Sequence, residues 1–420
     1  MHQRAPVSEF CLPMSQGPIL IVSNAGRPMF ARALDEAQLF PLVDASFAEA
    51  ADAVSTMQPA AVLVAAGGLP QADLAALAGQ IGGRKPYVPL LALDPLGPPP
   101  ANALPLWHSE ANSERLVARL RTALRVRALH ATVLRRLAGD PAQSILPSTD
   151  PTRDATALLI GRGGNYPALS VALGERMGVV GALSIEAAAS HLNNRDIDGL
   201  VLGEGFTPRV VDAFLTVLSE DARFRNLPLT VTSGQQARAY DLPNLEIISG
   251  KPADIAASAL PLIRQHAFEA QLNRALQALD AGGLLDPQTG LLTSSAFARD
   301  FSKAVEQSLS GGGGLSVARF AFEAGNQRAQ FDGARIISRL KRRTDFGAAH
   351  HDGSVLVVFS NTDLRDAHAI ARRLSSVMRH TSHGRRARSD AVVTVATLMP
   401  TDTPKSLLAR LYAESRRAAG

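Results

Sequence analysis

Short apolar segments alternate with helical patterns over residues 17–268 of this 420-residue chain. In each such segment almost every residue is Val, Ile, Leu or Ala, which is typical of strands that are covered on both faces. A parallel sheet with helices on both sides provides that cover. The sequence therefore predicts an α/β protein, and because the alternation occurs twice, it predicts two doubly wound domains.

The first domain is expected at residues 17–138, after a flexible tail at residues 1–16. Its strands and helices are predicted at Pro18–Val22, Ala60–Val64, Val88–Leu93, Arg27–Glu36 and Ser113–Leu137. A linker at residues 139–154 contains three prolines and separates this domain from the next. The second domain is expected at residues 155–268, with strands predicted at Thr156–Ile160, Gly199–Leu202, Leu227–Thr232 and Leu245–Ile248.

Both domains resemble the receiver domains of response regulators in two-component signalling. The resemblance rests on the layout of the strands, on Lys251-Pro252 after the last strand of the second domain, and on Thr232 or Ser233 after the strand before it. It implies two receiver-like, flavodoxin-like folds. Receivers are switched by phosphorylation of an Asp after the third strand, with Mg²⁺ held by acids after the first.

Neither domain has the residues that this switch requires. In the first, Ala66 stands at the phosphoacceptor position, and Ser23 and Asn24 replace the paired acids. In the second, Gly203 stands at the acceptor position with Glu204 beside it, and Gly161-Arg162 replaces the acids. Glu204 could imitate a permanent phosphoryl group, although a solvated loop acid is the simpler interpretation. We expect pseudo-receivers that serve in dimerisation, as a homodimer, or in the docking of protein partners.

The last domain is expected at residues 269–420, entered through a helix at 253–281 that Gly282-Gly283 ends. Its most distinctive segment is Arg342-x-x-Asp345, followed after five residues by His351-Asp352-Gly353-Ser354-Val355. The segment Asp286–Phe297 opens the domain, and a strand at Val392–Ala396 with a final helix closes it.

In this order, these motifs resemble the GGDEF family of diguanylate cyclases. In that family a hairpin reading Gly-Gly-Asp/Glu-Glu-Phe holds GTP, and an Arg-x-x-Asp motif upstream binds the product, cyclic di-GMP, as an inhibitor. The resemblance implies an α/β, nucleotide-cyclase-like fold. Arg-x-x-Asp alone is weak evidence, because the chain has four further copies, which we expect to be solvated pairs; they begin at Arg32, Arg195, Arg209 and Arg238.

The departures from the family argue against catalysis. Joining two GTP molecules requires divalent metal, and carboxylates must hold it. The strand at Leu315–Phe322 contains no Asp, and Gly353 and Ser354 replace the hairpin acids. Asp352 stands one residue early, which in a hairpin reverses the face of a side chain. The segment that would read guanine is shortened to residues 324–331. We expect no catalytic residue and no active diguanylate cyclase.

His350 and His351 raise the question of a metal site beside Asp352. Adjacent residues of an extended segment point to opposite faces, so two adjacent histidines rarely bind one ion. A polar cluster at the tip of the hairpin is the better interpretation, and we expect no metal and no cofactor.

The Arg-x-x-Asp motif keeps the chemistry that recognises guanine. Arg342 can donate to guanine O6 and N7, and Asp345 can accept from N1–H and the N2 amine through charge-assisted bonds. The family adds an arginine on the helix after the hairpin, which Arg373 matches. Further positive charge around the motif is expected from Arg339, Lys341 and Arg343.

The layout resembles the PleD-type response-regulator cyclases and, more closely, the PopA-type proteins, which are cyclic di-GMP effectors that no longer synthesise it. The sequence therefore predicts a non-catalytic cyclic di-GMP-binding effector, with the ligand held by Arg342, Asp345 and Arg373. Two alternatives remain: a scaffold in which the motif binds nothing, and a residual diguanylate cyclase.

Composition agrees with a folded protein, since 46% of the residues are hydrophobic. The single cysteine, Cys11, lies in the tail, so disulfides contribute nothing to the expected fold. No apolar stretch is long enough to span a membrane. The net charge is only +5, and the basic segment at residues 379–388 lacks interleaved aromatic residues, so we expect a solvated loop and no nucleic-acid partner. A cytoplasmic location is expected.

Overall fold

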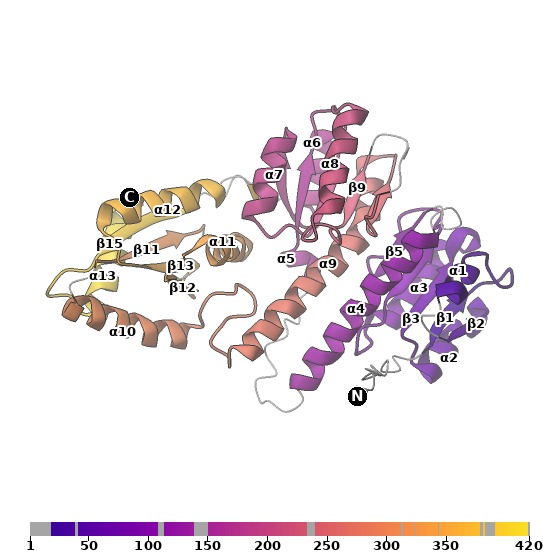
Figure 1. Ribbon diagram of the computed structural model, residues 1–420, viewed down its shortest axis with the longest axis horizontal. Helices are drawn as coiled ribbons and strands as arrows, with labels where there is room; N and C mark the ends of the chain where they lie inside the picture. Colours follow the sequence, from indigo (N-terminus) through magenta and orange to yellow (C-terminus); the bar gives the residue numbers. More distant parts are fainter. Residues whose placement is uncertain are drawn as a thin grey trace, which may run out of the picture.

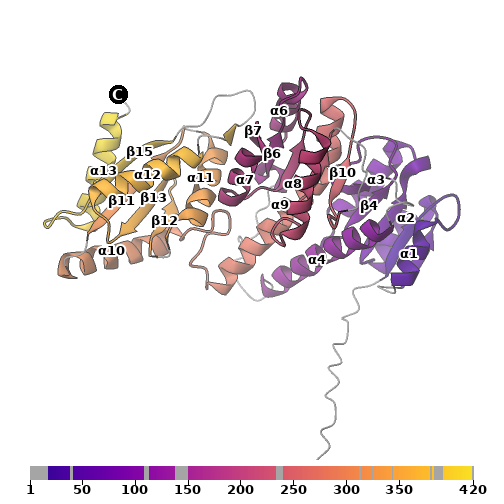
Figure 2. The same ribbon diagram turned by 45° about the horizontal axis from the view of Figure 1, so that its top comes forward.

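Three sheets, each with its own helices, follow one another along the described part of the chain, and the second domain lies between the other two (Figures 1 and 2). The structure is a computed structural model. It describes residues 18–37, 41–107, 113–137, 150–232, 240–311, 314–323, 325–342, 344–378, 381–382 and 391–418. The expected tail with Cys11, most of the linker, and Arg343 lie outside these residues.

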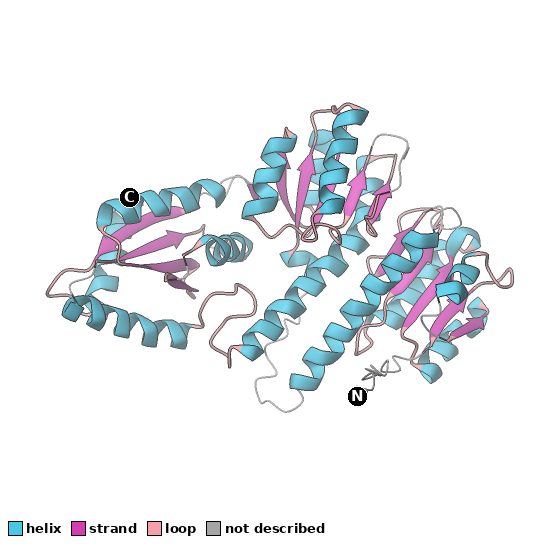
Figure 3. Cartoon of the chain, viewed as in Figure 1, coloured by secondary structure: helices cyan, strands magenta, loops and turns pink. Residues whose placement is uncertain are grey.

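The first domain is a parallel sheet covered by helices on both faces (Figure 3). Its strands are β1 (Ile19–Val22), β2 (Leu42–Ala45), β3 (Ala61–Ala65), β4 (Leu90–Leu93) and β5 (Ala103–Leu106), in the order β2-β1-β3-β4-β5. Its helices are α1 (Phe30–Ala37), α2 (Phe47–Met57), the 3₁₀ turn η1 (Ala66–Gly68), α3 (Gln71–Gly82) and α4 (Ser113–Leu137). The strand order is that of flavodoxin-like domains.

The second domain repeats this order. Its strands are β6 (Thr156–Ile160), β7 (Gly178–Ala182), β8 (Gly199–Leu202), β9 (Leu229–Val231) and β10 (Leu245–Ile247). Its helices are α5 (Pro151–Asp154), α6 (Tyr166–Gly174), α7 (Ile185–Asn194), α8 (Pro208–Glu220) and α9 (Pro252–Asp280). The parallel strands are ordered β7-β6-β8-β9-β10. An α/β fold with two doubly wound sheets is therefore present, as the alternation of apolar segments predicts.

A short strand from the C-terminal domain extends the second sheet. This strand, β14 (Thr381–Ser382), pairs antiparallel with β7, with Thr381 opposite Val180 and Ser382 opposite Val179. It covers the backbone donors and acceptors at this part of the sheet edge, which would otherwise be open to another strand.

The first two domains contact each other through α4 and α9, which lie side by side (Figure 1). The apolar seam between them contains Val126, Val133 and Leu137 from α4 and Leu272 and Ala275 from α9. Arg125 pairs with Glu269 and Arg136 with Asp280, both at a sequence separation of 144 residues. A constant separation means that the two helices run parallel.

A buried ion pair joins the same two domains. Arg119 of α4 is 1% exposed, and its Nη1 lies 2.5 Å from Oε1 of Glu246 in β10. Its guanidinium also donates to the carbonyls of Pro105, Pro243 and Leu245. Because a buried guanidinium requires an acceptor for each donor, this pairing fixes how the domains fit together.

The C-terminal domain is an antiparallel sheet between two layers of helices. Its elements are α10 (Ser294–Gly311), β11 (Leu315–Ala321), α11 (Gln327–Leu340), β12 (Phe346–Ala349), β13 (Ser354–Ser360), α12 (Leu364–Met378), β15 (Val392–Thr397) and α13 (Pro404–Ala418). The strand order is β12-β13-β11-β15. Residues of β11 alternate between two cores: Val317 packs with α10 and α13, and Ala318 packs with α11 and α12.

Helix α9 ends where the C-terminal domain begins. Gly282 and Gly283 have positive φ angles of 62° and 76°, and their N–H groups donate to the carbonyls of Leu279 and Ala278. This is a Schellman cap, for which glycine is the favoured residue. The helix therefore ends just before Gly282-Gly283, as the sequence predicts. No described helix is long and apolar enough to cross a membrane.

Candidate ligand-binding site

Asp345 lies in the turn that joins α11 to β12. The antiparallel pairing of β12 with β13 brings it to the end of β13, where its Oδ1 accepts a hydrogen bond of 3.3 Å from the backbone N–H of Ser360. Its other oxygen, Oδ2, is buried and has no hydrogen-bond partner among the described residues. Burial raises the pKa of Asp345, although the nearby charges of Arg342 and Lys341 act in the opposite direction.

A hollow of about 470 Å³ lies beside this carboxylate. Its walls come from the segment before α10, from α10, from the turn before β12 and from the end of β13. The charged residues that line it are Asp300, Lys303, Lys341 and Asp345. Arg342 is exposed at the same turn, and among the described residues it forms no ion pair with Asp345. The motif thus presents one exposed guanidinium and one buried carboxylate that form no ion pair with each other.

The structure does not bring Arg373 to these two residues. Arg373 is exposed on α12, which covers the face of the sheet opposite to α10. The hollow beside Asp345 is lined by α10, and no contact joins Arg373 to Arg342 or Asp345 in the described part of the chain.

Arg339 also differs from expectation. Its Nη1 donates to the carbonyl of Arg195 at 2.9 Å and to Oδ1 of Asp196 at 2.8 Å, both in the second domain. Arg339 lies in the last turn of α11, which ends at Leu340, whereas Arg342 lies beyond the helix, after Lys341 in extended conformation. The prediction that Arg339 adds charge around the motif is therefore wrong.

A salt bridge occupies the tip of the hairpin between β12 and β13. Arg319 of β11 lies 3.1 Å from Oδ2 of Asp352, and its guanidinium lies over the ring of Tyr412 at 4.9 Å. Burial would raise the pKa of Asp352, but hydrogen bonds from Ser354 and Arg319 outweigh it and lower the pKa to about 2. The acid of this hairpin is therefore ionised and neutralised by a fixed cation.

The geometric argument made for the two histidines is wrong. His350 and His351 lie at the turn after β12, and their rings are 4.3 Å apart, so they are neighbours on one side of the chain. His350 Nδ1 also lies 3.5 Å from Asp352. In the described residues no group of three His, Cys, Asp or Glu side chains is arranged to hold a metal ion.

The start of α11 faces the second domain. Asn326 caps this helix by accepting from the N–H of Ala329 at 3.1 Å. Arg328 donates to the carbonyls of Arg153 and Ala155, and Arg335 donates to the carbonyl of Asp154 at 3.0 Å. The segment that, by resemblance, corresponds to guanine recognition in a cyclase therefore borders a domain contact.

Arg195 belongs to the same contact. It is 1% exposed, and it donates to Asp332 of α11 at 3.3 Å and to the carbonyl of Val377 in α12. The expectation that Arg195 and Asp198 form a solvated pair is wrong. The roles of Arg119 and Arg195 were not predicted from the sequence. Arginine is usually exposed, and no local motif indicates which arginines another domain will bury.

The residues that the receiver resemblance aligns with the phosphoacceptor and the paired acids follow the carboxyl ends of strands in the two parallel sheets. Ser23, Asn24 and Ala66 follow β1 and β3, and Asn24 accepts a hydrogen bond of 3.1 Å from the N–H of Phe47. In the second domain Glu204 is exposed and accepts from Nδ2 of Asn165 at 3.1 Å.

Comparison with known proteins gave a partial similarity. No protein-family model and no curated protein matches the sequence. Among solved structures, the GGDEF domain of DgcB from Caulobacter crescentus in complex with c-di-GMP is 16% identical, with a TM-score of 0.28 over 32% of this chain and 87% of that chain. The FimX GGDEF domain from Pseudomonas aeruginosa is 19% identical, with a TM-score of 0.30 over 32% and 93%.

A third match covers more of the chain at a lower score. The C-terminal domain of glucosamine-fructose-6-phosphate aminotransferase from Francisella tularensis is 15% identical, with a TM-score of 0.19 over 60% of this chain and 84% of that chain. About a third of the chain is thus similar to GGDEF domains, and we infer neither ligand nor activity from these similarities.

Proposed function

We propose that this protein is a non-catalytic effector that binds cyclic di-GMP at Arg342 and Asp345, and that its first two domains dock protein partners. The observation that carries this proposal is the buried, unpartnered Oδ2 of Asp345, a residue that lines a hollow, with the exposed guanidinium of Arg342 at the same turn. A buried acceptor without a donor is unfavourable by about 1–3 kcal/mol, so a ligand that supplies the donor gains that much.

Guanine supplies both halves of the required chemistry. Its N1–H and N2 amine can donate to Asp345, while O6 and N7 accept from the planar fork of Arg342. Because Asp345 is only 2% exposed, the turn that carries it must move for a base to reach it. The two phosphates of the ligand would find Lys341 and Lys303 at the walls of the hollow.

Two features support the non-catalytic part of the proposal. Arg319 neutralises Asp352, which is the only acid of the hairpin tip, so a divalent cation would have to displace a guanidinium 3.1 Å away. The start of α11, which by resemblance corresponds to the segment that reads guanine, is held against the second domain by Arg328, and this contact reduces access to it.

The test is calorimetric titration of cyclic di-GMP into the full chain and three variants. Arg342→Ala is expected to weaken binding at least ten-fold, about 1.4 kcal/mol, because it removes the donor fork. Arg373→Ala tests whether the third residue contributes. Arg372→Ala is its matched control, since both arginines are exposed neighbours on α12, and it is expected to bind as the unaltered chain does.

The outcomes separate the alternatives. No heat from the unaltered chain, together with no protection of residues 341–345 from hydrogen exchange, would favour a ligand-independent scaffold, which the near-complete burial of Asp345 also suits. Formation of cyclic di-GMP from GTP and Mg²⁺ would favour a residual cyclase and would contradict the reasoning from Arg319 and Asp352.

A further inference from the structure

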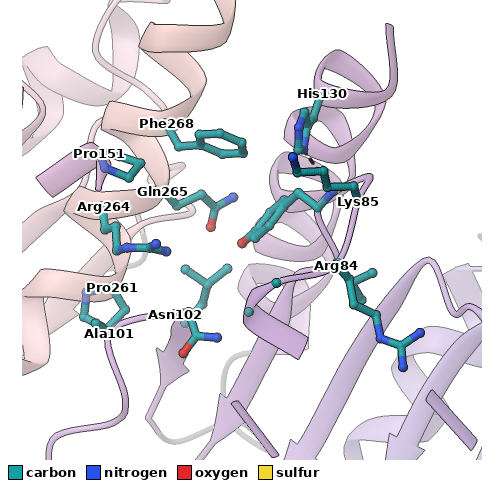
Figure 4. Close-up of a pocket in the computed structure, with 15 residues that line it drawn as sticks. Arg84, Lys85, Ala101, Asn102, His130, Pro151, Pro261, Arg264, Gln265 and Phe268 are labelled. Atoms are coloured by element: carbon teal, nitrogen blue, oxygen red, sulfur yellow. Dashed lines mark hydrogen bonds between the residues drawn. The ribbon is translucent and has the colours of Figure 1, made fainter. Parts of the chain in front are cut away.

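A cavity of about 210 Å³ lies between the first domain and α9, far along the chain from the Arg342 turn (Figure 4). One wall comes from the segment between α3 and β4, together with Asn102 and His130. The other wall comes from α9 and from Pro151 at the start of α5. Pockets at domain interfaces are common ligand sites. This cavity has walls from both domains, so it forms only when the two domains are in contact.

The charge of this interdomain cavity is positive. Lys85 and Arg264 line it from opposite walls, and Arg84 also lines it, but the guanidinium of Arg84 points away from it (Figure 4). No Asp or Glu is among its lining residues. Arg264 uses Nε to donate to Asp150 at 3.1 Å, and within the described residues its two terminal nitrogens have no hydrogen-bond partner. Lys85 likewise forms no ion pair in the described part of the chain.

Aromatic rings form the rest of the walls. Tyr87 and Phe268 lie edge to face with ring centroids 5.6 Å apart, and His130 and Phe268 lie edge to face at 5.1 Å. His130 Nδ1 accepts from the backbone N–H of Tyr87 at 3.0 Å, which fixes the imidazole with its other nitrogen protonated. Edge-to-face contacts of this kind are favourable for a further ring placed among them.

Several polar groups that line the cavity can donate hydrogen bonds. In Figure 4 the side chains of Arg264 and Gln265 extend from α9 toward the first domain. Burial raises the pKa of the Tyr87 hydroxyl, so this group stays protonated and can donate. Two cations, a phenol and an amide around an aromatic wall match an anion that carries a planar part.

We propose that the interdomain cavity binds a small organic anion, a carboxylate or phosphate ester attached to a single planar ring. The cavity has room for roughly seven water molecules, which limits the buried part to about one ring. The ring lies against Tyr87 and Phe268, and the anionic group lies between Lys85 and Arg264. Such a ligand contacts both walls and therefore strengthens the docking of the first domain on α9.

The experiment titrates phenyl phosphate into the full chain by calorimetry, with inorganic phosphate and benzoate as separate probes. The variants are Lys85→Met and Arg264→Gln, and Arg84→Met is the matched control because it removes a neighbouring positive charge that points away from the cavity. We expect phenyl phosphate to bind more tightly than inorganic phosphate. Each cavity variant should weaken it at least ten-fold, while the control leaves it within about two-fold.

Thermal unfolding provides two further readouts, one for the fold of each variant and one for ligand binding. Thermal unfolding of each ligand-free variant shows that the substitution has left the fold in place, and phenyl phosphate should raise the unfolding temperature of the unaltered chain and of Arg84→Met only. Equal weakening by Arg84→Met would mean that general positive charge attracts the probe, and the proposal would be overturned. Absence of binding for all three probes would overturn it as well.

Discussion

Replacement of Arg119 by Met should open the contact between the first two domains. The guanidinium is 1% exposed, pairs with Glu246 at 2.5 Å and donates to three backbone carbonyls. Its removal leaves the Glu246 carboxylate, whose side chain is 2% exposed, without its main partner. Loss of one member of a buried ion pair typically destabilises by about 3–5 kcal/mol. Arg115, 3.7 Å from Glu246, should keep the effect toward the lower end of that range.

The assay is native-state hydrogen exchange of α4 and β10, because a chain of three domains does not unfold in one step. A loss of about 3–5 kcal/mol corresponds to protection that falls by a factor of roughly 150 to roughly 5,000. The double replacement Arg119→Met with Glu246→Leu removes both charges and should recover most of the protection. Protection unchanged in Arg119→Met, or a double variant as poorly protected as the single one, would refute the reasoning.

Four further effects are expected elsewhere. His130 is 7% exposed, and burial is the main cause that lowers its pKa to about 4. Its stabilising contribution is therefore complete above about pH 6.5 and falls by about 3 kcal/mol as the pH drops to about 4. In His130→Leu the urea midpoint should depend less on pH over that range. The raised pKa of Asp345 gives a pH dependence of the opposite sign, because its stabilising contribution is present at low pH and is lost as the pH rises through the raised pKa. Above about pH 4, the unfolding free energy of the unaltered chain should therefore fall relative to that of Asp345→Asn. A Cβ on Gly347 would lie 2.5 Å from the Leu356 carbonyl oxygen, so Gly347→Ala should lower the unfolding free energy of the C-terminal domain by about 1–3 kcal/mol. Gly79 is an exposed helical residue with open space around it, so Gly79→Ala should raise the unfolding free energy of the first domain by about 0.5–1 kcal/mol.

Most of the strands that could be predicted from the sequence lie at the centres of the parallel sheets, where burial gives them an almost wholly apolar composition. The strand β10 was also predicted although it lies at the edge of its sheet, because two of its three residues are buried. The strand β2 escaped prediction because its residues are only half buried and include Asp44. The strand β5 contains Pro105, which is tolerated because β5 lies at the edge of its sheet. The strand β7 contains two glycines, Gly178 and Gly181, which weaken any strand pattern.

The environment of the candidate site could not be predicted from the sequence. Arg342 and Asp345 precede the hairpin of β12 and β13, as the motif order indicates, and whether they bind a ligand stays a prediction. The burial of Asp345 depends on packing against β13 and α10, which no local pattern specifies. The same holds for Arg195, whose acceptors lie on two helices of another domain.

The parallel packing of α4 against α9 has a consequence for assembly. Two identical chains that meet through a parallel helix pair do so at equal residue numbers, and the pair then carries two copies of whatever follows it. Here the partners are the last helices of two successive repeats, separated by 144 residues, so a single molecule makes the contact with itself. Because the association is intramolecular, dilution does not weaken it. The helix pair leads into one C-terminal domain instead of two, and a reaction that needs two such domains face to face would have to recruit the second by some other surface.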